Sequence, residues 1–441
     1  MYEHAWHNLT LRLGNDLGGF NDQINRNPQF LAFTNTEHIS RPITFSIKSV
    51  GSDDVILFTF NQSFGQARVG KSTEALFSLA ALPSQWQNVF TRNPQPPYQS
   101  FWGLYGQNIR QEGVEVLGDQ VAFANYAHIW RAMLDVLHDV HCGPNDISEQ
   151  LQPEEDFLTG RYVFVTTKAW GRCKIFYEKS GDATCGLDIV FLHTAGSDSR
   201  QYHGVMNDAT MRERCRMVAF DLPSHGRSFP SPAYPVGGHF NSEDAYMECI
   251  AAVIKALKLR QPILCGASMA GQACIAAAIR YEEVGVCGTI PLQGCERVEM
   301  KREWHDKSPL INSATFNPEW VYGMMCPTAP LENRQLLWHT YSGQAYGVYH
   351  GDLDFYFNGW DGRGRVETID TNKCPVYFLV GEYDWSNTPE MSEKTARKIP
   401  GAQFKRMPKL GHFPATENPT IFVPYLLEAV EYIASRGKAV V

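Results

Sequence analysis

The chain has 441 residues, 44% of them hydrophobic and 12% aromatic, which is enough for a sizeable core and suits two domains. Its net charge of -8 offers no basic surface for nucleic acid or an anionic membrane, so we expect neither partner. The N-terminus lacks a basic region followed by an apolar run, and no stretch approaches a transmembrane span, so we expect a cytoplasmic protein. The 11 cysteines include no C-x-x-C pair, which favours reduced thiols over disulfides or metal ligands.

The first third of the chain mixes strand and helix signals and predicts an α+β domain over residues 1–150. Residues 1–40 have the character of helix and loop. Apolar alternation predicts strands at Thr44–Val50, Val55–Asn61, Ser63–Val69 and Val114–Leu117. Helical periodicity predicts helices at Ser72–Leu82, Pro83–Phe90 and Ala122–Leu137. The acidic, proline-containing stretch Pro144–Asp156 is the expected linker.

A strand meander, helices carrying Trp86, and the run Val-Glu-Val-Leu-Gly-Asp before a closing helix occupy roughly residues 40–140. This arrangement resembles the sterol-carrier-protein-2-like fold, in which a sheet and helices enclose an apolar ligand tunnel. The resemblance therefore implies a bound apolar ligand. The alternative is a packing or dimerisation module with a filled core, which we favour, and a homodimer is left open.

From Tyr162 onward strands and helices alternate, which indicates a mostly parallel sheet covered on both faces. We place this second domain at residues 156–441. An opening hairpin is predicted at Tyr162–Thr167 and Lys174–Lys179. Buried strands are predicted at Leu187–Leu192, Met217–Phe220, Pro262–Cys265, Gly288–Leu292 and Val376–Val380.

Residues 262–280 carry the strongest local signal of the chain. A short apolar strand runs into a sharp turn with Ser268 at its apex, and an Ala-rich helix follows. This is the context of a G-x-S-x-G nucleophile elbow, with Gly266 at the first small position and Ala270 at the second. The alternative for the motif alone is an ordinary junction with a helix-capping serine.

Further motifs lie in a fixed order along residues 160–440, and together they resemble the α/β-hydrolase superfamily. They are His193-Thr-Ala-Gly, Asp221-Leu-Pro-Ser-His-Gly-Arg-Ser, Gly266-Ala-Ser-Met-Ala-Gly, Gly381-Glu-Tyr-Asp384 and Gly411-His412. The resemblance implies an α/β-hydrolase fold with a helical cap. The order Ser, Asp, His is also the order that this fold uses.

The candidate catalytic residues follow from what acyl transfer requires. Ser268 needs a base to become nucleophilic, and His412 has a suitable pKa and loop position. Asp384, after the strand Val376–Val380, would fix the imidazole tautomer. Glu296, Asp361 and Asp370 are the competing acids, and Glu296, after an earlier strand, is alternatively a substrate contact.

An oxyanion formed during acyl transfer needs two N–H donors. We expect the first from Met269, directly after the nucleophile. We expect the second from Ala195, in the loop after His193. We expect neither a metal nor an organic cofactor.

Residues 297–372 break the strand–helix rhythm and are rich in aromatic residues, so we expect the helical cap there. Trp338 and Tyr341 lie about one helical turn apart and are the predicted pocket residues. The sequence thus predicts a serine hydrolase for a small or mid-sized apolar or aromatic carbonyl compound. The bond cleaved would be an ester, a lactone, or a carbon–carbon bond next to a ketone. The competing interpretation is an apolar-ligand-binding or receptor-like protein with vestigial activity.

Overall fold

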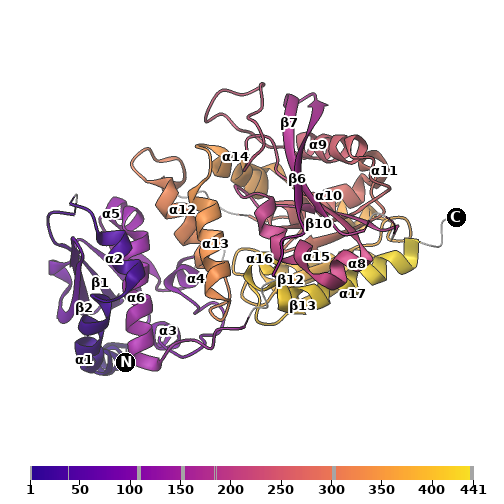
Figure 1. Ribbon diagram of the computed structural model, residues 1–441. Coiled ribbons are helices and arrows are strands. Elements are labelled where there is room, and N and C mark those ends of the chain that lie inside the picture. The colour runs from indigo at the N-terminus through magenta and orange to yellow at the C-terminus, as the bar shows by residue number, and fades with distance from the viewer. Residues whose placement is uncertain are drawn as a thin grey trace. The chain divides into compact units, whose positions relative to one another are not determined.

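The computed structural model describes residues 2–37, 39–106, 111–149, 154–182, 184, 186–299 and 304–437. The chain divides into two compact units, shown in Figure 1. The first comprises residues 1–147 and 302–323, and the second comprises residues 148–301 and 324–441. The segment expected to form a cap, residues 297–372, is therefore divided, since 302–323 belongs to the first unit.

The first unit is built on a mixed five-stranded sheet in the order β3-β2-β1-β4-β5. Its strands are β1 (Ile43–Ser49), β2 (Asp54–Asn61), β3 (Phe64–Lys71), β4 (Phe77–Ala81) and β5 (Glu115–Gly118). β1 is antiparallel to β2 but parallel to β4. The observed sheet and helices agree with the predicted α+β character.

The predicted helix at Ser72–Leu82 is wrong. The segment forms a single 3-10 turn, Ser72–Glu74, and then the strand β4. All five residues of β4 are buried between β1 and β5. Sheet pairing on both sides therefore overrides the helical preference of Ala and Leu in this stretch.

The helices of the first unit include one that is distant in sequence. They are α1 (Tyr2–Ile24), α2 (Pro28–Thr34), α3 (Pro83–Val89), α4 (Phe101–Tyr105), α5 (Gln120–Asn125), α6 (Ala127–Cys142) and α12 (Ser313–Tyr322). Trp102 of α4 is fully buried, and its ring lies 4.9 Å from that of Trp130 and 5.1 Å from that of Trp320 in α12. The aromatic core of the unit thus includes a helix contributed from beyond residue 300.

The second unit is built on an eight-stranded sheet in the order β13-β12-β11-β10-β8-β9-β7-β6. Its strands are β6 (Thr159–Thr167), β7 (Gly171–Ser180), β8 (Asp188–Leu192), β9 (Arg216–Phe220), β10 (Ile263–Ala267), β11 (Gly288–Leu292), β12 (Tyr377–Gly381) and β13 (Gln403–Met407). β6 and β7 form the predicted hairpin, and β10 lies parallel between β8 and β11. The β-strand β13 has no counterpart in the sequence analysis.

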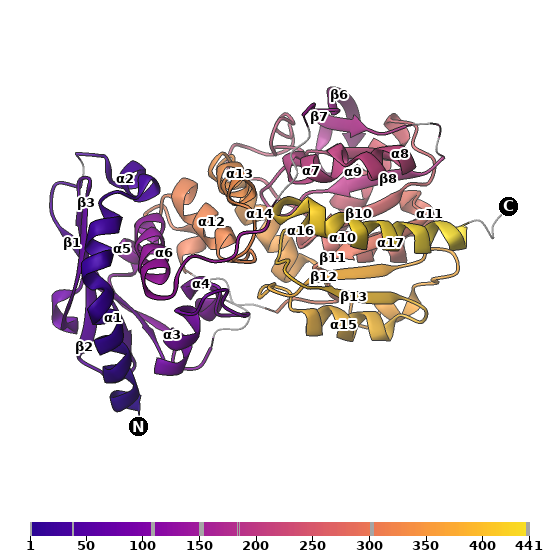
Figure 2. The same cartoon turned by 60° about the horizontal axis from the view of Figure 1, so that its bottom comes forward.

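Side chains alternate between the two faces of this sheet and form two separate cores. Val190 and Leu192 of β8 belong to one core, with residues of α9 (Glu243–Ala256), α10 (Met269–Ile279) and α15 (Pro389–Lys398). Ile189 and Phe191 belong to the other, with residues of α7 (His203–Asn207), α8 (Ala209–Arg214) and α17 (Pro419–Gly437). Figure 2 shows α17 beside the strands of this sheet. This is the mostly parallel sheet, covered on both faces, that the strand–helix alternation predicted.

Further helices of the second unit are α11 (Tyr281–Val284), α13 (Leu331–Ser342), α14 (Val348–Asp354), α16 (Pro414–Glu417), a π-helix (Phe355–Gly359) and the 3-10 helices Ser199–Tyr202 and Val366–Thr368. Within the described residues, we find no helix with the length and apolar character that crossing a bilayer requires.

A buried ion pair joins α6 and α12 in the first unit. Arg131 Nε and Nη2 donate to the two carboxylate oxygens of Glu319 at 2.6 and 3.0 Å. The Glu319 side chain is fully buried, and the Arg131 side chain is 3% exposed. Arg131 also contacts Asp135, whose side chain is 48% exposed. Removing one partner of such a buried pair leaves the other charge without compensation.

We expect Glu319→Gln to lower the free energy of unfolding of the first unit by about 3–5 kcal/mol, because the Arg131 charge stays buried. The matched control is Asp135→Asn, which removes a half-exposed partner of the same arginine and should cost below about 1 kcal/mol. Urea unfolding followed by tryptophan fluorescence measures both. Equal losses for the two variants would contradict the assignment of α12 to the core of this unit.

Candidate active site

Ser268 lies at the turn between β10 and α10, in the middle of the eight-stranded sheet. Its backbone has φ 61° and ψ -120°, a sparsely populated conformation that costs of order 1–3 kcal/mol for a residue other than glycine. The Ser268 amide donates to Leu292 O at 3.0 Å. The strain is therefore held in place by the neighbouring strand, as in a nucleophile elbow.

The small residues around Ser268 are required by close backbone packing. A Cβ on Gly266 would lie 2.6 Å from Cβ of Ala270. A Cβ on Gly271 would lie 2.3 Å from Leu292 O. Since real Cβ atoms do not approach other atoms this closely, larger side chains at 266 and 271 would force β10, α10 and β11 apart.

His412 and Asp384 come together at the same end of the sheet. His412 Nδ1 lies 2.8 Å from Asp384 Oδ2, and both residues are buried. The other carboxylate oxygen of Asp384 accepts from the amides of Ser386 and Asn387 at 2.8 and 3.0 Å. With Nδ1–H donated to the carboxylate, the imidazole has a free Nε2 lone pair for a proton of the nucleophile.

His412 is hydrogen-bonded to Asp384, but no hydrogen bond is formed between Ser268 and His412 in this structure. Such contacts often tighten only when substrate is bound. The Tyr356 hydroxyl also lies close to Ser268, and burial raises the pKa of Tyr356 well above its usual range, although Ser386 and Ser268 lower it. Tyr356 and Ser386 are site residues that the sequence analysis missed.

Glu417 fixes the loop that carries His412. Its carboxylate accepts from the amides of Gly411 at 2.7 Å and Phe413 at 2.8 Å, which flank the histidine, and from Cys326 at 3.0 Å. Glu417 is fully buried, and burial raises its pKa to about 7 in spite of these three donors. It therefore holds the loop on both sides of His412. In the sequence, only the position of Glu417 five residues after His412 could have indicated this contact.

The loop after β8 supplies one free amide at the expected position. Thr194 N donates to Gln201 Oε1 at 2.9 Å, Gly196 N to Asp352 Oδ2 at 2.8 Å, and Ser197 N to Thr194 O at 3.1 Å. Among the described residues, Ala195 N has no such acceptor. Met269 is the first residue of α10, where an N–H has no partner within the helix. Both predicted oxyanion donors are thus open.

Tyr341 and Trp338 both belong to α13, as predicted. The Tyr341 hydroxyl lies 2.6 Å from Thr194 Oγ1, and its side chain is buried. Trp338 is half-buried. Tyr341 therefore contacts the loop after β8, which its spacing from Trp338 did not indicate.

Glu296 lies apart from His412. Lys398 Nζ donates to its two carboxylate oxygens at 2.6 and 2.7 Å. The structure therefore brings Asp384, and not Glu296, to the imidazole.

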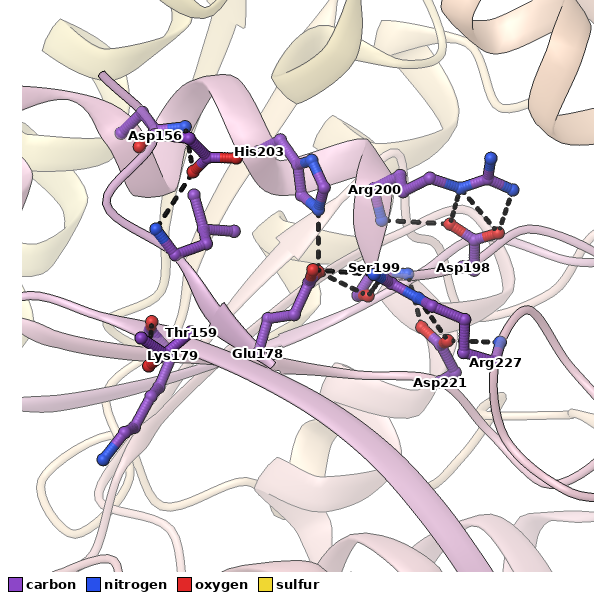
Figure 3. Close-up of polar contacts among 12 residues, drawn as sticks. Asp156, Thr159, Glu178, Lys179, Asp198, Ser199, Arg200, His203, Asp221 and Arg227 are labelled. Atoms are coloured by element: carbon purple, nitrogen blue, oxygen red, sulfur yellow. Dashed lines mark hydrogen bonds and ion pairs between the residues drawn. The ribbon is translucent and has the colours of Figure 1, made fainter. Parts of the chain in front are cut away.

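A network of carboxylates anchors the loops that follow β8 and β9, as Figure 3 shows. Asp221 accepts from the amides of Ser199 and Arg227, both at 2.8 Å. Glu178 accepts from His203 Nε2 at 2.7 Å and from Arg227 Nη1 at 2.8 Å. Burial opposes its charge, but these donors outweigh burial and lower the pKa of Glu178 to about 2. The network fixes the ends of both loops.

One group of side chains has the composition of a metal site. His225, His239 and Asp352 are buried, and their ligand atoms all lie within 4.8 Å of one another. The imidazole nitrogens, however, contact the carboxylate directly, at 2.7 and 3.0 Å. Zinc at about 2.0–2.1 Å from each ligand would hold tetrahedral ligands roughly 3.4 Å apart. The observed spacing is that of hydrogen bonds.

An open groove of about 650 Å³ lies elsewhere on the second unit, between α7, α8, α13 and α17. Its lining includes none of Ser268, His412 and Asp384. Two of its lining residues, Arg200 and His203, contact the carboxylates of Asp198 and Glu178. The groove is therefore separate from the candidate catalytic residues.

Comparisons with known proteins agree with this architecture. A model of the alpha/beta hydrolase family matches residues 189–424. A thermophilic esterase from Thermogutta terrifontis is similar in structure with a TM-score of 0.52 and 21% identity, over 62% of this chain and 99% of that one. An enol-lactonase from Burkholderia xenovorans gives 0.52 and 15%, over 62% and 100%. A carboxylesterase from Bacillus subtilis gives 0.51 and 18%, over 62% and 92%.

At these identities the structural likeness shows the fold alone. The comparison with curated proteins gives no match.

The raised pKa of Glu417 makes a prediction about stability and pH. Between its usual pKa of 4.5 and about 7, the folded chain binds a proton that the unfolded chain has released. The contribution of Glu417 to the free energy of unfolding therefore decreases by about 3 kcal/mol as the pH rises through this window. At higher pH this contribution stays constant. Glu417→Gln removes this dependence, so the stability of the variant relative to wild type should rise with pH.

Denaturant unfolding at about pH 5 and about pH 8 measures the difference. Glu431→Gln, on the exposed face of α17, is the control for loss of a glutamate charge. A stability difference for Glu417→Gln that stays constant, or that falls with pH, would show that the buried carboxyl does not titrate in this range.

Proposed function

Because the chain belongs to the alpha/beta hydrolase family, we propose that it is a serine hydrolase that uses Ser268, His412 and Asp384. The observation that carries the proposal is the hydrogen bond of 2.8 Å from His412 to Asp384, on the same sheet as the strained turn of Ser268. In this mechanism His412 takes the proton of Ser268 Oγ as the hydroxyl attacks a carbonyl carbon. The Met269 and Ala195 amides stabilise the oxyanion, and His412 then protonates the leaving group.

Water completes the reaction on the acyl-enzyme. His412 removes a proton from water as its oxygen attacks the acyl carbon. When the second oxyanion collapses, the bond to Ser268 Oγ breaks, His412 returns the proton to that oxygen, and the acid is released. Asp384 holds the imidazole in the tautomer that both half-reactions need. These steps are carried out by residues of this chain.

The proposed substrate is an ester or a lactone of small to medium size with an apolar or aromatic group. Support comes from the buried aromatic residues Tyr341 and Tyr356 beside the oxyanion loop and Ser268. The similar solved structures include an esterase and an enol-lactonase. Cleavage of a carbon–carbon bond next to a ketone is the second candidate, since a buried ring such as Tyr356 suits an aryl ketone. Aryl esters, lactones and aryl 1,3-diketones assayed side by side distinguish the two.

Other proposals concern the whole protein. The described cysteines are free and mostly buried, which supports a reducing, cytoplasmic compartment. The likeness of residues 40–140 to the sterol-carrier-protein-2-like fold stays a prediction, as does a homodimer. Lipid extraction of the purified protein and its mass in solution test these two proposals.

We expect Ser268→Ala to fold normally and to lose roughly 10⁴–10⁶-fold in kcat on an aryl ester, because the nucleophile is absent. Asp384→Asn should lose on the order of 10⁴-fold, because it favours the wrong imidazole tautomer. The matched control is Glu296→Gln, which removes a buried carboxylate held by Lys398, and its kcat should change by less than about tenfold. Steady-state kinetics give the three values. A larger loss for Glu296→Gln than for Asp384→Asn would reject Asp384 as the acid.

A further inference from the structure

Asp352 is a buried carboxylate that the proposed mechanism does not use. It lies on α14, and its side chain is fully buried. Three donors surround it: Gly196 N at 2.8 Å, His225 Nε2 at 2.7 Å and His239 Nε2 at 3.0 Å. A buried charge with this many aligned donors is well compensated and holds its partners in fixed positions.

The protonation of the two histidines follows from what faces them. His225 Nδ1 lies 3.0 Å from Pro223 O, and its Nε2 faces Asp352. Both neighbours are acceptors, so both ring nitrogens carry protons and the ring is positively charged. Burial opposes this charge, but Asp352 outweighs burial and raises the pKa of His225. The group is therefore an ion pair, with His239 as an additional donor.

The carboxylate reaches the oxyanion loop through a backbone amide. Gly196 N–H donates to Asp352 Oδ2, and Gly196 follows directly after Ala195. On the other side of Ala195, Thr194 N is held by Gln201. The peptide groups on both sides of the open Ala195 amide are thus fixed, and Asp352 accounts for one of the two.

Packing around Gly196 leaves no room for adjustment. Gly196 has a φ of +65°, and a Cβ there would lie 2.7 Å from both Gln344 Oε1 and Cδ2 of Tyr349. Gln344, which follows α13, and Tyr349, near the start of α14, therefore lie directly against the loop. A shift of Asp352 would be transmitted to Gly196, since close-packed interiors pass on small displacements.

We propose that Asp352, paired with His225 and His239, is a positioning residue for the oxyanion hole, which aims the Ala195 amide at the developing negative charge. The inference rests on the proposed function. It assigns to α14 a role in catalysis without contact to the substrate. If the Ala195 amide is misaligned by a fraction of an ångström, its hydrogen bond to the transition state is weakened more than its hydrogen bond to the ground state.

Asp352→Asn in the full chain is the first test. Loss of the charge releases His225 and weakens the bond to Gly196 N. We expect kcat on an aryl ester to fall about 10–100-fold while KM changes by less than about threefold, because a transition-state contact is lost. The affinity for an aryl trifluoromethyl ketone, whose adduct with serine carries the same oxyanion, should fall by about the same factor as kcat/KM.

The matched control is Asp188→Asn at the start of β8. Asp188 is also a buried carboxylate, and it pairs with Arg216 and accepts from the Arg260 amide. It should lower stability but change kcat by less than about threefold. A merely structural role of Asp352 would give equal kcat for the two variants, and that result would overturn the proposal.

A second variant keeps the test available if Asp352→Asn does not fold. His239→Leu removes one donor and leaves the ion pair with His225 and the bond to Gly196 in place. It should lower kcat by about 3–10-fold with the same unchanged KM. A rise in KM with unchanged kcat in either variant would overturn the proposal. Binding of one equivalent of zinc to wild type, but not to Asp352→Asn, would also overturn the proposal.

Failure of the inference is distinguishable from failure of the proposed function. Wild-type activity that depends on Ser268, with unchanged kcat in Asp352→Asn, rejects the role of Asp352 alone. Activity that survives Ser268→Ala rejects the serine mechanism and, with it, the role of Asp352.

Discussion

The strained turn at Ser268 is the constraint on which the rest of the second unit depends. A serine with φ 61° and ψ -120° persists only where its surroundings hold it there. β10 lies between two parallel strands, and nearly all of α10 is buried. Gly266 allows α10 to lie close to β10, and Gly271 allows it to lie close to β11. The core of the sheet thus holds the hydroxyl group of the buried Ser268 at the carboxyl end of β10.

Buried carboxylates then set the loops around this turn. Asp384 orients an imidazole, Glu417 holds the backbone on both sides of that imidazole, and Asp352 holds the backbone beside Ala195. Each of them accepts hydrogen bonds from backbone amides. Asp384 accepts from two amides, Glu417 from three and Asp352 from one. Because amides are fixed by the chain path, a carboxylate that binds them determines the shape of a loop more firmly than side-chain packing alone.

The sequence predicted those parts of the candidate site whose signals are local. Ser268 and His412 lie in short motifs with a clear structural context, and their elements are found where expected. Asp384 was preferred over Glu296 from its place after β12, and the hydrogen bond to His412 agrees with that choice. The α/β-hydrolase fold followed from the strand–helix alternation and the order of the motifs.

The parts that could not be predicted depend on contacts between distant segments. The propensity of Ser72–Leu82 favours a helix, but pairing on both sides makes β4 a strand. Residues 302–323 pack with the first unit through the side chains of α12, which no local pattern indicates. Asp352 acts on an amide 156 residues away in sequence. No spacing rule connects such partners, so only the folded chain identifies them.

The central claim is that Ser268 is a nucleophile activated by His412, and covalent labelling tests it most directly. The native protein is treated with an aryl fluorophosphonate, and the intact mass and the modified peptide are measured by mass spectrometry. The account predicts one adduct per chain, on Ser268, that disappears in the His412→Ala variant and in the unfolded protein. An unlabelled Ser268 in the native protein, or a label of equal yield on another serine, would contradict it.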